Sequence, residues 1–170
     1  LPALDSDIAK RLRKQLEQRG VQFALQSGVT KIEQLEGNTL RVHYQKKGKD
    51  AFADAELVLM ATGRAANVGS LGLENTEIAY TKAGITVDEN MQTNVPGVYA
   101  IGDVNGKQML AHAATFQGFR AVNHIVGHAD RILFNIVPAA IFTHPEVGSV
   151  GLSEDQCKEQ GIAYKCRKGY

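Results

Sequence analysis

The chain has 170 residues, of which 44% are hydrophobic and 22% charged, so it is long enough for one domain or parts of two and is globular rather than disordered in composition. Nineteen basic and eighteen acidic side chains give a formal net charge of +1, which offers no electrostatic basis for binding nucleic acid or a membrane surface. No segment approaches the roughly 20 apolar residues that span a bilayer. We therefore expect neither nucleic acid nor a membrane as a partner.

The first predicted element is a helix that ends near Arg19. Its apolar residues Ile8, Leu12 and Leu16 recur every four positions, which places them on one face. Asp5 is suited to cap the start of this helix, and Gly20 follows its last turn. Strands are then expected over residues 21–27, 29–35 and 40–44, with a tight turn at 36–38 between the last two.

A lysine-rich segment at 46–49 separates the third of these strands from another strand-like segment that starts at Phe52. Because strands flank this basic cluster, we predict a solvated hairpin turn. The apolar run over 57–61 then indicates a strand buried on both faces of a mostly parallel sheet. It ends at Thr62-Gly63-Arg64, where a glycine allows a ligand to approach the backbone at the carboxyl edge of the sheet.

A second short buried strand is predicted at 98–101, and Gly102 and Asp103 follow it directly. Residues 110–125 are predicted to form a helix, with Gly127 beyond its end. Gly118 lies inside this helix, where glycine costs about 1 kcal/mol relative to alanine, so we expect close packing at that position.

The pattern changes near residues 129–136, where we place a domain boundary. Segments 136–142 and 147–151 are strand-like. Ser153 and Gln156 match a capping box, which predicts that a helix begins there and runs to Gly161.

The cysteines offer no redox or metal chemistry. Cys157 and Cys166 lie nine positions apart, which is neither a Cys-x-x-Cys redox motif nor a zinc-ligand spacing. We interpret both as ordinary thiols, predict no metal site, and expect a reducing compartment.

The most informative feature is a repeated strand ending, in which Ala61-Thr62-Gly63-Arg64 and Ala100-Ile101-Gly102-Asp103 each close an apolar run with a glycine and a polar residue. An aspartate in that place can accept charge-assisted hydrogen bonds from the hydroxyls of a polyol or ribose. Taken alone, each ending is a weak signal, and a plain turn is the favoured interpretation.

In their chain order these segments are more specific. The sequence resembles the FAD-dependent pyridine nucleotide-disulfide oxidoreductases at residues 57–67, 93–103 and 141–151, and the likeness covers essentially the whole chain. Met109-Leu110-Ala111-His112 resembles the branch that oxidises dihydrolipoamide, since glutathione and mercuric reductases usually carry other residues there. Two departures are Ala66, where the family often has proline, and Gln117, where it frequently has glutamate.

The resemblance implies an α/β fold made of partial Rossmann-like FAD- and NAD-binding domains, followed by the start of an α+β dimerisation domain. The corresponding division is 1–67 for the NAD-binding part, 68–135 for the FAD-binding part and 136–170 for the interface part. The residues it assigns to FAD are Asp103, Met109, Leu110, Ala111 and His112, and those it assigns to NAD are Gly63 and Val29.

Physical chemistry supports the assignment of Met109 to His112, because a helix start presents unpaired amides and positive dipole potential to a reduced flavin. His112 is expected to matter through its backbone, so we give its imidazole no acid–base role. His144-Pro145 is interpreted as a structural turn, because the family's catalytic histidine precedes a proline in a later segment.

The sequence contains no Gly-x-Gly-x-x-Gly, no redox cysteine pair and no carboxyl-terminal His-Glu pair. We therefore expect an internal fragment that has no catalytic residue and is inactive alone. The implied parent enzyme is a homodimer that oxidises dihydrolipoamide to lipoamide, through FAD to NAD+. Its partners are the lipoyl domains of 2-oxo acid dehydrogenase complexes, and its location is the bacterial cytoplasm or the mitochondrial matrix.

Two alternatives stay open. One is a relative of glutathione or mercuric reductase, which the redox motif and the C-terminal tail would distinguish. The other is a non-catalytic nucleotide-binding or assembly module, favoured if the chain folds alone as a natural gene product. Interrupted Rossmann-type units argue against this second alternative, because they leave sheet edges unpaired.

Overall fold

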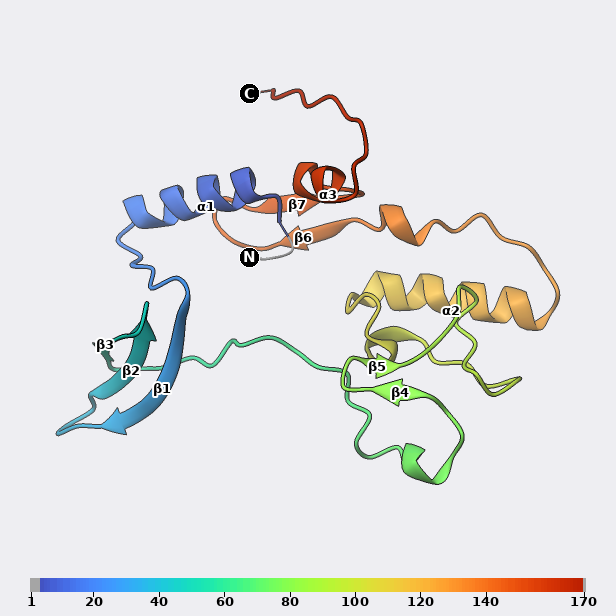
Figure 1. The fold of residues 1–170 in the computed structure, drawn as a ribbon, viewed down its shortest axis with the longest axis horizontal. Coiled ribbons are helices and arrows are strands. Elements are labelled where there is room, and N and C mark those ends of the chain that lie inside the picture. The colour runs from blue at the N-terminus through green and yellow to red at the C-terminus, as the bar shows by residue number, and fades with distance from the viewer. Residues whose placement is uncertain (1–3, 170) are drawn as a thin grey trace. The chain divides into compact units, whose positions relative to one another are not determined.

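The computed structural model describes residues 4–169, which form two compact units. One unit comprises Asp7–Thr62, and the other comprises the rest of the described chain. Figure 1 shows the order of the helices and strands in both units. Each unit is described by itself.

The first helix, α1 (Ser6–Gln18), has the predicted apolar stripe, and Leu12 on that stripe is only 3% exposed. Gly20 ends the helix with φ 91°, in the left-handed region that glycine adopts without a Cβ clash. Asp5 precedes the helix as expected. Its carboxylate, however, accepts hydrogen bonds from Glu154 N at 2.8 Å and Asp155 N at 3.4 Å, at the start of a distant helix.

Three strands follow: β1 (Ser27–Gln34), β2 (Leu40–Lys46) and β3 (Lys49–Ala55), which form an antiparallel sheet in the order β1-β2-β3 (Figure 1). The predicted lysine-rich turn is confirmed, because Lys46 pairs with Lys49 across it. Lys47 and Gly48 both have positive φ, at 52° and 75°, as a two-residue hairpin turn requires.

Three predicted strands are shorter than expected or absent. In the segment 21–27 only Ser27 joins a strand. Residues 57–61 are not paired into any strand, and Leu57 and Leu59 are each 89% exposed. Residues 98–101 contribute only one bridge, from Tyr99 to Gln92. The expected parallel sheet is therefore wrong for the described residues, in which every strand pair is antiparallel.

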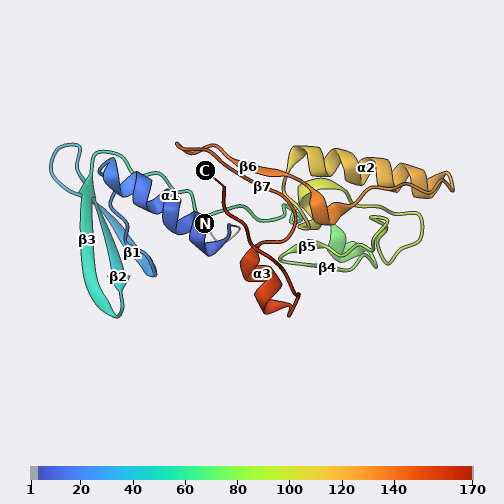
Figure 2. The ribbon, with the colours of Figure 1, turned by 90° about the horizontal axis from the view of Figure 1, so that it is seen from above.

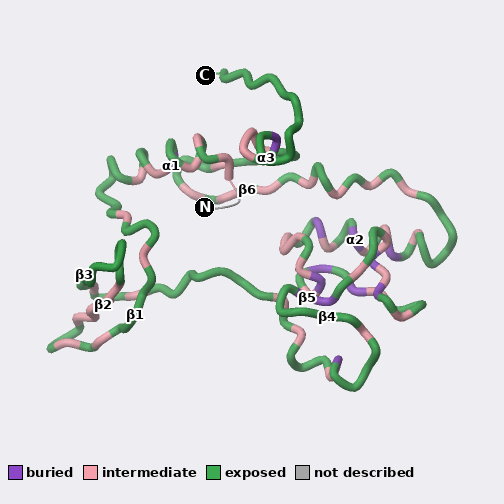
Figure 3. The backbone as a smooth tube through the Cα atoms, in the orientation of Figure 1, coloured by how far each residue is buried: buried purple, intermediate pink, exposed green. Residues whose placement is uncertain are grey.

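The second unit builds a small core below the long helix α2 (Ala111–Ile125). Its other elements are the short hairpin β4 (Tyr80–Thr81) and β5 (Gly84–Ile85), and 3-10 turns at Leu73–Asn75 and Gly102–Asn105. Figure 3 shows that buried residues gather around β5 and the inner face of α2. The core cluster consists of Leu73, Ile85 and Ala100, with Val68, Ile78, Val87 and Val104 packed against it.

The same unit ends in the hairpin β6 (Ala139–Ile141) and β7 (Val147–Ser149), which run side by side in Figure 2, and in the short helix α3 (Glu154–Glu159). A further 3-10 turn covers Phe134–Ile136. The capping box is confirmed: Gln156 N donates to Ser153 Oγ at 3.1 Å, and Ser153 N donates to Gln156 Oε1 at 2.9 Å.

Candidate cofactor site

The loop that carries Asp103 is a tight 3-10 turn, Gly102–Asn105. Gly102 begins it with φ 77°, and a Cβ at this position would lie 3.4 Å from the Cβ of Ala114. Both facts explain a glycine here, because a side chain would be strained and crowded. The turn directs the chain from the buried Ala100 to Asp103, whose side chain is 49% exposed and open to a ligand.

A buried hydrogen-bond network holds this loop on its side facing α2. Gln117 on α2 is 1% exposed, and its Oε1 accepts hydrogen bonds from Gly102 N at 2.7 Å and from Asn105 Nδ2 at 2.8 Å. Asn105 Nδ2 also donates to Ala100 O at 3.0 Å. The sequence showed Gln117 only as a departure from glutamate, and its spacing from the strand ending gave no signal of this contact.

The segment Met109 to His112 leads into the amino-terminal end of α2. Leu110 is the N-cap residue in an extended conformation, and no side chain caps the helix there. The first backbone N–H groups of a helix have no partner within it, so the amides after Leu110 are available to an acceptor. Together with the positive end of the helix dipole, they favour a ligand atom with negative charge.

The imidazole of His112 has a structural contact. Its Nε2 lies 2.7 Å from the carbonyl oxygen of Pro138, so this nitrogen carries the proton and donates. The bond connects the start of α2 to the segment before β6.

One side chain connects Asp103 with Met109. Arg64 Nη1 donates to Asp103 Oδ2 at 3.2 Å, and Arg64 Nη2 donates to the carbonyl oxygen of Met109. Arg64 follows Gly63 directly, so the two strand endings identified in the sequence meet through this guanidinium. Among the described residues 4–169, none donates a hydrogen bond to Asp103 Oδ1, whereas Oδ2 accepts from Arg64.

The two residues assigned to NAD are found in different units. Gly63 adopts φ 109°, and no heavy atom outside its chain neighbours lies within 4 Å of a Cβ built there. Its backbone is therefore open to a close approach. Val29 lies on β1, opposite Tyr44, with 63% of its surface exposed.

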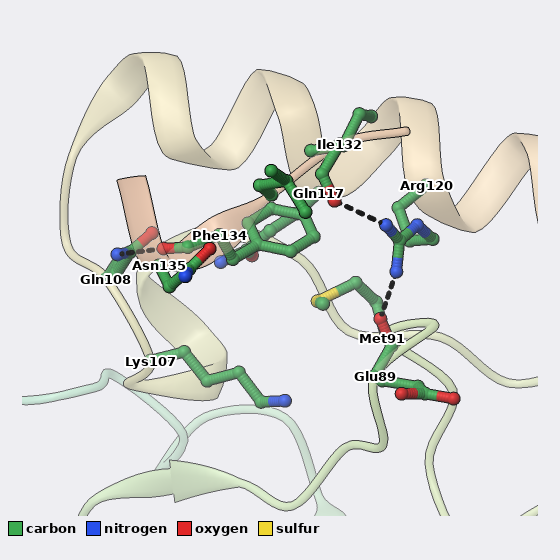
Figure 4. Close-up of a pocket in the computed structure, with 10 residues that line it drawn as sticks. Glu89, Met91, Lys107, Gln108, Gln117, Arg120, Ile132, Phe134 and Asn135 are labelled. Carbon is green, nitrogen blue, oxygen red and sulfur yellow. Dashed lines mark hydrogen bonds between the residues drawn. The ribbon is translucent and has the colours of Figure 1, made fainter. Parts of the chain in front are cut away.

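A cavity of about 400 Å³ lies beside α2, and none of the predicted cofactor residues lines it (Figure 4). Arg120 spans its wall: Nη1 donates to Glu89 O at 3.1 Å and Nη2 to Ile132 O at 2.7 Å. Its Nε lies 2.8 Å from Asp130 Oδ2, and the two side chains are only 18% and 10% exposed. Arg120 thus anchors the segment after α2 through contacts of all three of its side-chain nitrogens.

The ionisation of Asp130 follows from these contacts. The hydrogen bond from Arg120, supported by the amide of Ile132, lowers the pKa of Asp130 to about 2. The same hydrogen bond raises the pKa of Arg120. This pair is a stabilising ion pair rather than an acid–base couple, because neither group titrates near neutral pH.

The remaining sequence features add no chemistry. Cys157 is buried, Cys166 is exposed, and both are free thiols. His144 lies in a bend, where Thr143 Oγ1 donates to the carbonyl oxygen of Pro145 at 2.8 Å. Over residues 4–169, no group of three or more His, Cys, Asp or Glu side chains could hold a metal ion, and no helix could cross a membrane.

Comparison with known families gives two matches. Residues 1–118 match the family described as pyridine nucleotide-disulphide oxidoreductase. Residues 137–170 match the dimerisation domain of the same description.

Known relatives give the same result. The chain is 36% identical over 170 residues to dihydrolipoyl dehydrogenase 1, mitochondrial, of Arabidopsis thaliana, a match that covers 99% of this chain and 34% of that protein. It is 39% identical over 163 residues to dihydrolipoyl dehydrogenase of Chlamydia muridarum, covering 95% of this chain and 34% of that protein. The chain thus spans about a third of the length of these curated relatives.

Two solved structures have the same fold. LpdA of Mycobacterium tuberculosis superposes with a TM-score of 0.80 at 29% identity, over 93% of this chain and 34% of that one. The HOCl-induced flavoprotein disulfide reductase RclA of Escherichia coli superposes with a TM-score of 0.79 at 29% identity, over 95% of this chain and 37% of that one.

Proposed function

Because the chain belongs to the pyridine nucleotide-disulphide oxidoreductase family, we propose that it supplies part of the residues that contact FAD and NAD in a dihydrolipoyl dehydrogenase. The proposed reaction is oxidation of dihydrolipoamide to lipoamide, with two electrons passing through FAD to NAD+. The identity to dihydrolipoyl dehydrogenases along nearly the whole chain supports this reaction over that of a glutathione or mercuric reductase.

The observation that carries the proposal is that an exposed carboxylate and an uncapped helix start are held together by Arg64. FAD offers complementary groups: a chain of ribityl hydroxyls that donate hydrogen bonds, and a ring whose reduced form is anionic. Asp103 would accept from the hydroxyls, and the segment from Met109 to His112 would face the ring with the unpaired amides that follow Leu110. FAD supplies the electron chemistry, and these residues supply placement and polarity.

We propose that Gly63 and Val29 each contribute a contact to NAD, and each position is argued within its own unit. The open backbone at Gly63 supports the first position, because a ligand can approach a glycine there without meeting a side chain. Val29 presents an exposed apolar side chain on β1, which suits contact with a flat ring. We assign no catalytic residue to this chain: neither thiol is paired, and His112 donates to a carbonyl.

The proposed domain division is 1–67, 68–135 and 136–170. The match of residues 137–170 to a dimerisation domain supports a homodimer contact in the last part. Lipoyl domains of 2-oxo acid dehydrogenase complexes are the proposed partners. The relatives include mitochondrial and bacterial proteins, so the proposed location is the mitochondrial matrix or the bacterial cytoplasm.

The test is flavin retention. Because this sequence contains no Gly-x-Gly-x-x-Gly, the test uses the full-length protein of which this chain is a part. That protein is mixed with FAD and passed through gel filtration, and the flavin absorbance that elutes with it is measured. The proposal expects retained flavin in the unchanged full-length protein and loss of it in Asp103→Ala. Asp50→Ala, a change of the same kind on β3, is the control and should retain flavin. Equal flavin in Asp103→Ala and the unchanged protein would contradict the assignment of Asp103.

A further inference from the structure

Arg64 connects three segments that are distant in sequence. It lies on the segment after Gly63, and its two terminal nitrogens reach Asp103 in the 3-10 turn and Met109 before α2. The guanidinium suits this task, because its donors form a rigid planar fork that can engage two acceptors at once. A lysine in its place would offer a point charge on a flexible stem and no fixed fork.

We infer that Arg64 is the positioning residue of the FAD site. It holds Asp103 and the start of α2 in fixed positions relative to each other and to Gly63. This inference rests on the proposed function, because it assumes that Asp103 and Met109 face FAD. It adds a residue with its own role to that site. Arg64 is also the residue directly after Gly63, the backbone position assigned to NAD.

The magnitudes favour a local role over a contribution to overall stability. The side chains of Arg64 and Asp103 are 65% and 49% exposed. An ion pair this exposed contributes only a few tenths of a kcal/mol to about 1 kcal/mol to folding. Ordering two short segments before a ligand arrives has more effect on binding, because the ligand then does not bear that entropic cost.

Asp103 also keeps its ligand-binding capacity in this arrangement. Arg64 contacts Oδ2, so Oδ1 remains available to a hydroxyl, and the contact fixes the rotation of the carboxylate. Gln117 holds the same turn from the buried side through Gly102 N. The turn is thus held on its buried side by the amide oxygen of Gln117 and on its exposed side by the guanidinium of Arg64.

The experiment compares Arg64→Met and Arg64→Lys with the unchanged chain. Arg41→Met is the matched control, because Arg41 also pairs with an aspartate, Asp54, at 2.7 Å, but on the β2–β3 sheet. The first readout is the dissociation constant for FAD of the full-length protein that contains this chain, measured from the quenching of FAD fluorescence. The second is the backbone order parameter of Asp103 and of residues 109–112, measured by NMR relaxation without FAD. The third is the thermal midpoint.

The inference expects Arg64→Met to bind FAD about tenfold more weakly, which corresponds to about 1.4 kcal/mol. The order parameters of residues 103 and 109–112 should fall from about 0.85 toward about 0.6 in that variant, while the thermal midpoint changes little. Arg64→Lys should restore little of the binding, because it lacks the fork. Arg41→Met should bind FAD like the unchanged protein.

In the double variant Arg64→Met with Asp103→Asn, FAD binding should be weakened by less than the product of the two single effects, since both changes break one contact. Normal order parameters in Arg64→Met would overturn the inference, whether or not FAD binds. An unchanged full-length protein that binds no FAD would contradict the proposed FAD contacts. The order parameters would then still decide whether Arg64 orders the two segments.

Discussion

Asn105 donates a buried hydrogen bond to Gln117, with 2.8 Å between Nδ2 and Oε1, and the same oxygen accepts from Gly102 N. A single side-chain oxygen therefore holds both ends of the turn that carries Asp103. An unpartnered buried donor costs about 1–3 kcal/mol. The position of Asp103 thus depends on a residue fourteen positions later in the chain.

Gln117→Leu should destabilise the protein strongly. The change introduces an apolar side chain of similar size and leaves two buried N–H groups without this acceptor, so we expect a loss of about 2–4 kcal/mol from the free energy of unfolding. Urea denaturation measures it. Gln15→Leu, an exposed glutamine on α1, should change stability by less than about 0.5 kcal/mol. Gln117→Glu keeps an accepting oxygen and should lose less than Gln117→Leu; the reverse order would refute this role.

Gly118→Ala should stabilise the protein. A Cβ at this position would lie 3.5 Å from Ile101 Cδ1, an ordinary van der Waals distance, so the close packing expected from the sequence is wrong. Alanine in a helix interior is favoured over glycine by about 0.5–1 kcal/mol, and we expect a rise in Tm of about 2–4 °C. Gly102→Ala is the comparison and should lower Tm, because φ at that position is 77°. A fall in Tm for Gly118→Ala would show that the space is not available.

Asp130 should contribute an acid-sensitive part of the stability. Its folded-state pKa is lowered to about 2 by the hydrogen bond from Arg120. Its stabilising contribution is therefore complete above the unfolded pKa and is lost as the pH falls from about 4 through about 2. Asp130→Asn should be less stable at neutral pH and should lose less stability over that acid range. Stability curves against pH for this variant and for the exposed Glu36→Gln test the point; parallel curves for Asp130→Asn and the unchanged chain would contradict it.

Asp5→Ala should weaken the attachment of α3. Asp5 accepts from Glu154 N at 2.8 Å, and Ser6 N donates in return to Asp155 Oδ2 at 2.7 Å, so residues 5 and 6 are bound to the start of α3. Loss of a cap costs about 1 kcal/mol. Hydrogen exchange at residues 154–157 should become faster, and to a similar degree in Ser153→Ala, which removes the other cap of α3. Unchanged exchange in Asp5→Ala would mean that the Asp5 contact adds nothing to the capping box.

Local patterns in the sequence determined the helices and the hairpins. The apolar stripe of α1, the capping box of α3 and the lysine-rich turn are set by residues within one or two turns of each other, and all three are found as predicted. The long strands failed for the opposite reason. An apolar run such as 57–61 becomes a strand only if another strand pairs with it, and in the described residues none does.

The sequence by itself determined the family and the residues proposed to face FAD and NAD, because those assignments follow motifs in chain order. Only the tertiary structure decided how the site is held. It brought Arg64 onto Asp103 and Met109, Gln117 beneath Gly102 and Asp5 onto the start of α3. These contacts join residues that are 15 to 149 positions apart in the chain. Hydrogen bonds over such separations depend on where folding places each segment, and no periodicity or local propensity records that placement.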